Sequence, residues 1–123
     1  MEEVNERIEI KENEVCVKGK CLKYVGEDFI DVEVPTENSE KTGDLSGYYI
    51  YQIMKNYVVS IDFLKLFRKY YATFGYIIFF NKDYSECVKV DGWTTWIFPR
   101  RRKKSVTLKF TFYEYKLEDE QTN

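Results

Sequence analysis

Hydrophobic and polar residues alternate along the first third of this chain, which is the pattern of half-buried β-strands. The alternation covers residues 14–25 and 29–34. Gly19 stands between two lysines in the middle of the first stretch, so we predict a hairpin whose turn spans residues 18–20. The second stretch, FIDVEV, predicts a third strand with one solvent-exposed (wet) face, which is acidic and therefore poorly suited to nucleic acid.

Helical spacing replaces the alternation in the middle of the chain. After Ser60, a favourable N-cap residue, apolar side chains recur every three or four positions, at Ile61, Leu64, Phe67 and Tyr71. We predict an amphipathic helix that starts there and ends at Gly75, with three cations on its polar side: Lys65, Arg68 and Lys69. Residues 48–57 are predicted to form a preceding helix, and 35–47 (PTENSEKTGDLSG) a surface loop.

Strand patterns return after Gly75 and predict a β-meander. We expect strands at 76–80, 84–90, 93–98 and 106–117, with turns at 81–83 and at Asp91-Gly92, because Asp-Gly between two β-rich runs is a strong hairpin signal. Residues 76–80 (YIIFF) are apolar on both faces, so they belong at the centre of the sheet, under a helix. The predicted fold class is α+β: an antiparallel β-meander with one or two helices packed on one face, distinct from the OB fold.

Length and composition indicate one domain. The chain has 123 residues, of which 1–117 suffice for a single core, and the acidic residues 118–123 are expected to form a flexible tail. No apolar run is long enough to span a membrane, and the charged N-terminus is not that of a secretory signal. We expect an intracellular protein with free thiols, although Cys16 and Cys21 flank Gly19 closely enough for a cross-strand disulfide.

Histidine is absent from the chain, which bears on catalysis because imidazole is the usual acid-base group and metal ligand near neutral pH. The sequence also lacks a phosphate-binding loop, a nucleophile elbow and a CxxC zinc pair. We therefore expect no enzymatic activity, no cofactor and no metal. A nuclease would need a metal held by acids such as Asp83, Glu86 and Asp91, which lie in predicted turns where solvation explains them.

Charge is unevenly distributed behind the net value of -2. Residues 1–47 hold 13 acidic and 6 basic side chains, whereas 48–117 hold 5 acidic and 13 basic ones. Five of these bases are consecutive: Arg100, Arg101, Arg102, Lys103 and Lys104. Like charges at such spacing need water or a polyanion to neutralise them, so this run is either a solvated hairpin loop or a phosphate-binding segment.

Aromatic rings surround the five cations, in the segment 93–115 (WTTWIFPRRRKKSVTLKFTFYEY). In its second strand, one parity holds the core candidates Val106, Leu108, Phe110 and Phe112, and the outward parity holds Thr107, Lys109, Thr111, Tyr113 and Tyr115. Unpaired nucleic acid needs such positive charge beside exposed rings. The predicted site is Arg100, Arg101, Arg102, Lys103, Lys104, Lys109, Tyr113, Tyr115, Trp96, Lys65, Arg68 and Lys69. Trp93 and Phe98 are further candidate rings, and since their parity is opposite, some of these rings must be core.

The chain also resembles a known family. It has no histidine, it is rich in Lys, Glu, Tyr and Ile (KNYVVSIDFLKLFRKYY, GYIIFF), and its basic-aromatic strand pair is followed by the acidic tail LEDEQTN. In these features it resembles small proteins of viruses that infect hyperthermophilic archaea, and in particular the single-stranded-DNA-binding proteins of archaeal rod-shaped viruses. The resemblance implies a dimer with a non-OB fold that binds single-stranded DNA without sequence preference, through Arg and Lys beside rings.

Two functions from different classes are consistent with these features. The first is a homodimeric single-stranded-DNA-binding protein that acts in viral replication or recombination in the host cytoplasm, with the acidic tail available to replication or nuclease proteins. The alternative is a viral protein-interaction module that inhibits a host defence complex, because aromatic and Arg side chains are also enriched at protein interfaces. Duplex recognition is less favoured, since no helix carries a cluster of Arg, Asn and Gln.

Overall fold

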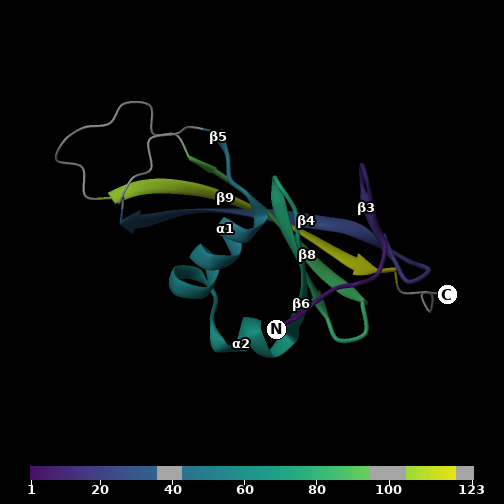
Figure 1. Cartoon of the computed structure of the whole chain (residues 1–123). Coiled ribbons are helices and arrows are strands. Elements are labelled where there is room, and N and C mark those ends of the chain that lie inside the picture. The colour runs from purple at the N-terminus through teal and green to yellow at the C-terminus, as the bar shows by residue number, and fades with distance from the viewer. Residues whose placement is uncertain (36–42, 95–104, 119–123) are drawn as a thin grey trace.

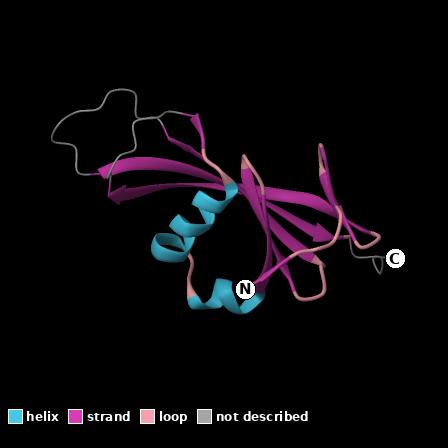
Figure 2. Cartoon of the chain, viewed as in Figure 1, coloured by secondary structure: helices cyan, strands magenta, loops and turns pink. Residues whose placement is uncertain are grey.

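The protein has a mostly-β α+β fold in which one curled sheet carries helices on one side (Figures 1 and 2). The structure, a computed structural model, describes residues 1–35, 43–94 and 105–118. The strands of this part are β1 (Glu2–Glu3), β2 (Ile8–Lys11), β3 (Glu14–Val17), β4 (Lys20–Pro35), β5 (Gly43–Asp44), β6 (Phe67–Ala72), β7 (Tyr76–Asn81), β8 (Glu86–Thr94) and β9 (Ser105–Leu117). The α+β class predicted from the sequence is confirmed.

Strands from both ends of the chain meet in this sheet. The order is β1-β6-β7-β8-β9-β4-β3-β2, with β5 paired to β8. Strands β7, β8 and β9 form an antiparallel meander in the predicted region, and β6, which was predicted as helix, precedes it. Strand β4 then pairs with β9 along almost its whole length. All of these pairings are antiparallel except the short parallel pair of β1 with β6, so the sheet is mixed and not purely antiparallel.

The first helix agrees with the sequence prediction. It consists of α1 (Gly47–Ile53) and the π-helical turn η1 (Met54–Val58), and the Ser46 hydroxyl caps it by accepting a hydrogen bond from the Tyr49 N–H, at 3.2 Å. Its inward side chains Ile50, Ile53 and Met54 pack on the sheet. The predicted helix at 48–57 is confirmed.

The second helix is much shorter than predicted. Ser60 caps α2 (Ile61–Leu66) as expected, with its hydroxyl 3.1 Å from the Phe63 N–H, but residues 67–72 form β6 and not helix. No side chain of α2 is buried, so extending the helix would gain little packing. As a strand, the aromatic-rich segment 67–72 pairs with β7 and buries Phe67, which outweighs the helical spacing.

Strand β8 runs straight through the predicted Asp91-Gly92 turn, so that turn prediction is wrong. Gly92 serves a different purpose, because a Cβ there would lie 2.6 Å from the ring of Phe110. The glycine lets the Phe110 ring approach the backbone of β8, which is another common reason for glycine within a strand. Trp93 and Thr94 therefore belong to β8, and residues 95–98 lie outside the described part.

The predicted hairpin and third strand at the N-terminal end prove to share one strand. The turn lies at Lys18 and Gly19, which both have positive φ, and β4 then continues for 16 residues. Where the sequence predicted a gap between two strands, β4 has a register shift between Tyr24 and Gly26. Such a bulge bends a strand without ending its pairing.

Two cores lie on opposite faces of the sheet, and β7 contributes to both. The helix-side core packs Ile77 and Phe79 with α1, η1 and the inward residues of β4, β8 and β9. The second core packs Ile78 and Phe80 with the N-terminal segment, β3 and the turn between β7 and β8. The prediction that residues 76–80 are central and buried on both faces is confirmed.

Cys16 and Cys21 form a disulfide, which corrects the expectation of free thiols. The two-residue turn makes Val17 and Lys20 the first pair of the hairpin, and Cys16 and Cys21 lie directly opposite each other in the next pair, with Cα atoms 4.0 Å apart. In antiparallel hairpins every second pair is of the close, non-hydrogen-bonded kind, whose Cα separation suits a disulfide. Cys87 is a buried free thiol, and burial raises its pKa to about 12.

The Cys16→Ser/Cys21→Ser variant is expected to lose about 2 kcal/mol of unfolding free energy, because the disulfide closes a loop of only a few residues and so removes little unfolded-state entropy. Urea denaturation with and without a dithiol reductant measures this loss. The reductant should destabilise the wild type by the same amount and leave the variant unchanged. Equal stability of the oxidised wild type and the variant would contradict the expectation.

Candidate nucleic-acid interface

The candidate surface is the part of the helix-free sheet face that the N-terminal strands leave uncovered. Strands β4, β9 and β8 lie side by side there, and Asp31, Lys109 and Trp93 are cross-strand neighbours in one row. Phe29 lies two residues before Asp31 in β4, on the same face, and is paired with Thr111 of β9. We call these five residues the open sheet face.

Both aromatic rings of the open sheet face are accessible. Trp93 is 45% exposed and Phe29 is 70% exposed, which is unusual for side chains of this size. The Lys109 side chain between their strands is 54% exposed. A ring and a cation therefore stand next to each other in the Trp93–Lys109 pair, whereas the sequence predicted Tyr113 and Tyr115 as the rings beside Lys109.

Acidic side chains make this face less cationic than predicted. The carboxylate of Asp31 lies 3.5 Å from the Lys109 ammonium, and the carboxylate of Asp91 lies 3.5 Å from the Lys89 ammonium. The acidic wet face of β4, recognised from the sequence, thus lies beside the outward face of β9, and it adds Glu27 and Glu33. Within the described residues, the cations of this face are paired with carboxylates.

Tyr113 and Tyr115 are less accessible than predicted. Tyr115 is 5% exposed and belongs to the second core, where burial raises its pKa to about 12. Tyr113 is half-buried, with the Lys89 ammonium 5.0 Å from its ring centre. Their outward parity was predicted correctly, but β3 and the N-terminal segment cover that end of the face. The prediction that Tyr115 is an exposed ring is wrong.

The three cations predicted on the second helix do not join the open sheet face. Lys65 is in α2, whereas Arg68 and Lys69 are in β6, which is separated from β9 by β7 and β8. The Lys69 ammonium lies 4.4 Å from the ring centre of Tyr84. Lys69 is level with Tyr115, six residues from Lys109 along β9, or about 20 Å at the rise of a strand.

Six predicted site residues lie outside the described part of the chain: Arg100, Arg101, Arg102, Lys103, Lys104 and Trp96. The described residues that flank this segment are Thr94 at the end of β8 and Ser105 at the start of β9. Trp93 is next to Thr94 in the chain. The sequence therefore connects the five cations directly to the strands that carry Trp93 and Lys109.

Phe29 is the exposed ring that the sequence prediction missed. It begins the FIDVEV run and shares the parity of Asp31 and Glu33, so alternation alone places it on the wet face. An apolar side chain at a wet position of a strand was the available signal.

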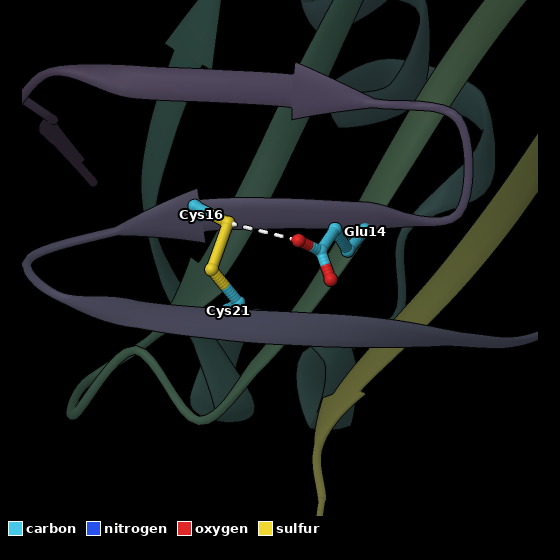
Figure 3. A group of neighbouring side chains, drawn as sticks. All are labelled: Glu14, Cys16 and Cys21. Atoms are coloured by element: carbon cyan, nitrogen blue, oxygen red, sulfur yellow. Dashed lines mark hydrogen bonds between the residues drawn. A yellow bond between two sulfur atoms is a disulfide. The ribbon is translucent and has the colours of Figure 1, made fainter.

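Among the residues that the structure describes, Glu14, Cys16 and Cys21 have their ligand atoms close enough together to hold a metal ion (Figure 3). The two sulfurs are bonded to each other, so they are not available as thiolates in this form. Glu14 pairs with Lys23, whose ammonium lowers the pKa of that carboxyl, and with Lys11 at 3.5 Å. The group is therefore a disulfide beside ion pairs.

Each of the three acids considered for a nuclease site interacts with a different partner. Asp83 accepts hydrogen bonds from Ser85, Glu86 pairs with Lys116 at 3.5 Å, and Asp91 pairs with Lys89. Burial raises the pKa of the Asp91 carboxyl, and the Lys89 ammonium opposes that shift. These three residues do not form a metal-ligand group in the described structure.

Comparisons with known proteins add no relative. No protein-family model matches this chain, and searches of curated proteins and of solved structures find no significant match. Within the described residues, neither the helix of 47–58 nor α2 has the length and apolar character needed to cross a bilayer.

Proposed function

We propose that this chain is a non-catalytic, sequence-tolerant binding protein for single-stranded DNA. The observation that carries the proposal is the Trp93–Lys109 pair, in which an exposed ring and an exposed cation are cross-strand neighbours. The two strands that hold this pair flank the segment with Arg100 to Lys104. Binding would use the curled sheet in place of an OB barrel.

Base stacking and phosphate neutralisation would involve different residues. Phe29 and Trp93 are two strands and two residues apart, which gives about 12 Å between them at normal sheet spacings, enough for two different bases. Each stacked base contributes about 1 to 3 kcal/mol. The acids around Lys109 repel phosphates, so the DNA backbone would follow the five-cation segment.

The test of this proposal is a titration with a fluorescently labelled oligonucleotide, in single-stranded and duplex form. Trp93→Leu is expected to weaken single-strand binding about 5- to 150-fold, because it removes one stacking ring. Tyr57→Leu is the matched control, since it removes an exposed ring from η1, and its affinity should stay within about twofold of the wild type.

A second variant of the same titration examines the charge argument. Asp31→Asn removes the carboxylate beside Lys109 and should strengthen binding, because Lys109 is then free to contact phosphate. The proposal fails if Trp93→Leu binds like the wild type, if duplex binds as tightly as the single strand, or if Asp31→Asn weakens binding.

A second candidate function is a protein-interaction module, such as a viral inhibitor of a host defence complex. Exposed apolar side chains of α2 and of the turn before β7 favour it: Ile61, Leu64, Leu66 and Phe74, the last of them 92% exposed. Such surfaces mark protein contact sites. Under this function, oligonucleotides leave the Trp93 fluorescence unchanged, and Ile61→Lys weakens capture of the partner.

The remaining expectations from the sequence belong to the same proposal. They are a homodimer, action in viral replication or recombination inside the host cell, and a tail from residue 118 that contacts replication or nuclease proteins. Sedimentation of the protein alone and with oligonucleotide tests the homodimer.

A further inference from the structure

The longest strand of the sheet has an open edge. Strand β4 pairs with β9 from Leu22 to Pro35, but on its other side it pairs with β3 only through Lys20 to Lys23. From Gly26 to Pro35, no strand in the described part of the chain lies on that side. In this stretch β4 and β9 run side by side (Figure 1).

Such an edge offers unused backbone groups. Along an antiparallel strand, the N–H and C=O groups of every second residue point to the neighbour on one side, and those of the residues between point to the other side. The residues of β4 that do not bond to β9 therefore direct their backbone groups away from the sheet. Proteins commonly shield an edge of this length, because it accepts a further strand.

Side chains along the edge define what strand would fit. On the helix-free face it carries the acids Glu27, Asp31 and Glu33, with the Phe29 ring between the first two, and all four are exposed. On the helix side it carries Ile30, Val32 and Val34, which pack on the core, preceded by the exposed Asp28. From Ile30 to Val34 an added strand would therefore place one parity beside carboxylates and the other beside aliphatic side chains. Cross-strand pairs favour cations in the first case and apolar residues in the second.

We propose that the edge of β4 from Gly26 to Pro35 binds an extended segment of a partner protein in which basic and apolar residues alternate. The segment adds one strand to the sheet through backbone hydrogen bonds, and its basic side chains pair with the β4 acids. The edge shares Phe29 and Asp31 with the open sheet face. Strand addition itself uses the backbone groups of β4, so it does not require the proposed binding of single-stranded DNA.

A second copy of the same edge fits poorly. Antiparallel self-pairing centred on Phe29 sets Glu27 opposite Asp31, and pairing centred on Ile30 sets Glu27 opposite Glu33. Like charges directly opposite each other are destabilising. The edge of β2 is a weaker candidate, because that strand has only four residues.

The experiment uses the full chain and synthetic ten-residue peptides with a fluorescent label. The probe alternates lysine and valine, and its control has the same composition with five lysines followed by five valines. Fluorescence anisotropy should show tighter binding of the alternating peptide, by about tenfold, because only this order presents cations and valines to the matching faces. Hydrogen exchange of the β4 amides should slow when that peptide is added.

Backbone modification of the peptide separates strand addition from simple charge attraction. All valine amides of an alternating peptide point to one side of the strand and all lysine amides to the other. N-methylation of one set should abolish binding, because only one set forms hydrogen bonds to β4. Methylation of the other set should leave the affinity within about threefold of that of the unmethylated peptide.

Variants of the protein test the role of the acids. Glu33→Lys should weaken binding of the alternating peptide about three- to tenfold, while Glu12→Lys, which reverses an exposed acid outside the edge, should change it less than about twofold. Equal binding of alternating and block peptides would overturn the proposal. So would equal effects of the two methylations, or sedimentation showing that a second copy occupies this edge.

Discussion

Gly47→Ala is expected to destabilise the protein by at least about 3 kcal/mol, although alanine normally favours a helix. A Cβ at this position would overlap the carbonyl oxygen of Tyr76, and it would lie 2.5 Å from the Thr73 carbonyl oxygen. Both are backbone atoms, and the Gly47 N–H itself donates to the Thr73 oxygen at 2.6 Å. Relief therefore requires the start of α1 to move away from the sheet.

Urea denaturation measures this effect, and Gly75→Ala provides the matched control. Gly75 lies in the same turn region, and a Cβ there meets nothing within 4 Å. Its substitution should change the free energy of unfolding by less than about 0.5 kcal/mol. Equal stabilities of the two variants would mean that α1 does not approach the turn between β6 and β7 as closely as the structure has it.

Replacing Arg100, Arg101 and Arg102 by alanine is expected to flatten the salt dependence of single-stranded DNA binding. Each lost phosphate contact reduces the slope of log K against log salt by up to about 0.7, so three contacts reduce it by about 2. At about 50 mM salt the affinity should fall by roughly two orders of magnitude. Titrations at several salt concentrations measure both quantities.

A control of equal charge is the triple alanine variant of Lys65, Arg68 and Lys69. These cations lie on α2 and β6, away from the open sheet face, so their loss should change the slope far less. Thermal unfolding of both variants checks that the fold is retained. If the two triple variants have the same slope, the segment 100–104 has no special role in binding. If the alanine variant of Arg100, Arg101 and Arg102 has the slope of the wild type, this segment is not part of the site.

Local patterns predicted the elements that depend on local chemistry. Ser60 caps a helix because its hydroxyl reaches the Phe63 N–H, an interaction within one turn. Residues 76–80 are buried on both faces because every side chain of that run is apolar. In each case the neighbouring sequence carries the whole cause of the structure.

The errors arose where a distant strand decides the outcome. Gly92 was interpreted as part of a turn, but the ring of Phe110, eighteen residues away, accounts for it. Residues 67–72 have helical spacing and yet pair with β7. Tyr115 has outward parity and is covered by the N-terminal strands. Parity predicts the side to which a residue points, but not what covers that side.

The pairing of β4 with β9 also constrains how the chain folds during synthesis. Strand β9 leaves the ribosome after the other strands of the described part, and it lies between β8 and β4 in the finished sheet. Until residues 105–117 have emerged, the N-terminal hairpin has no attachment to the meander through the middle of the sheet. Contacts between segments that are far apart in the sequence form slowly. Nascent chains in which synthesis is arrested before residue 105 lack β9, so their β4 should remain accessible to proteases.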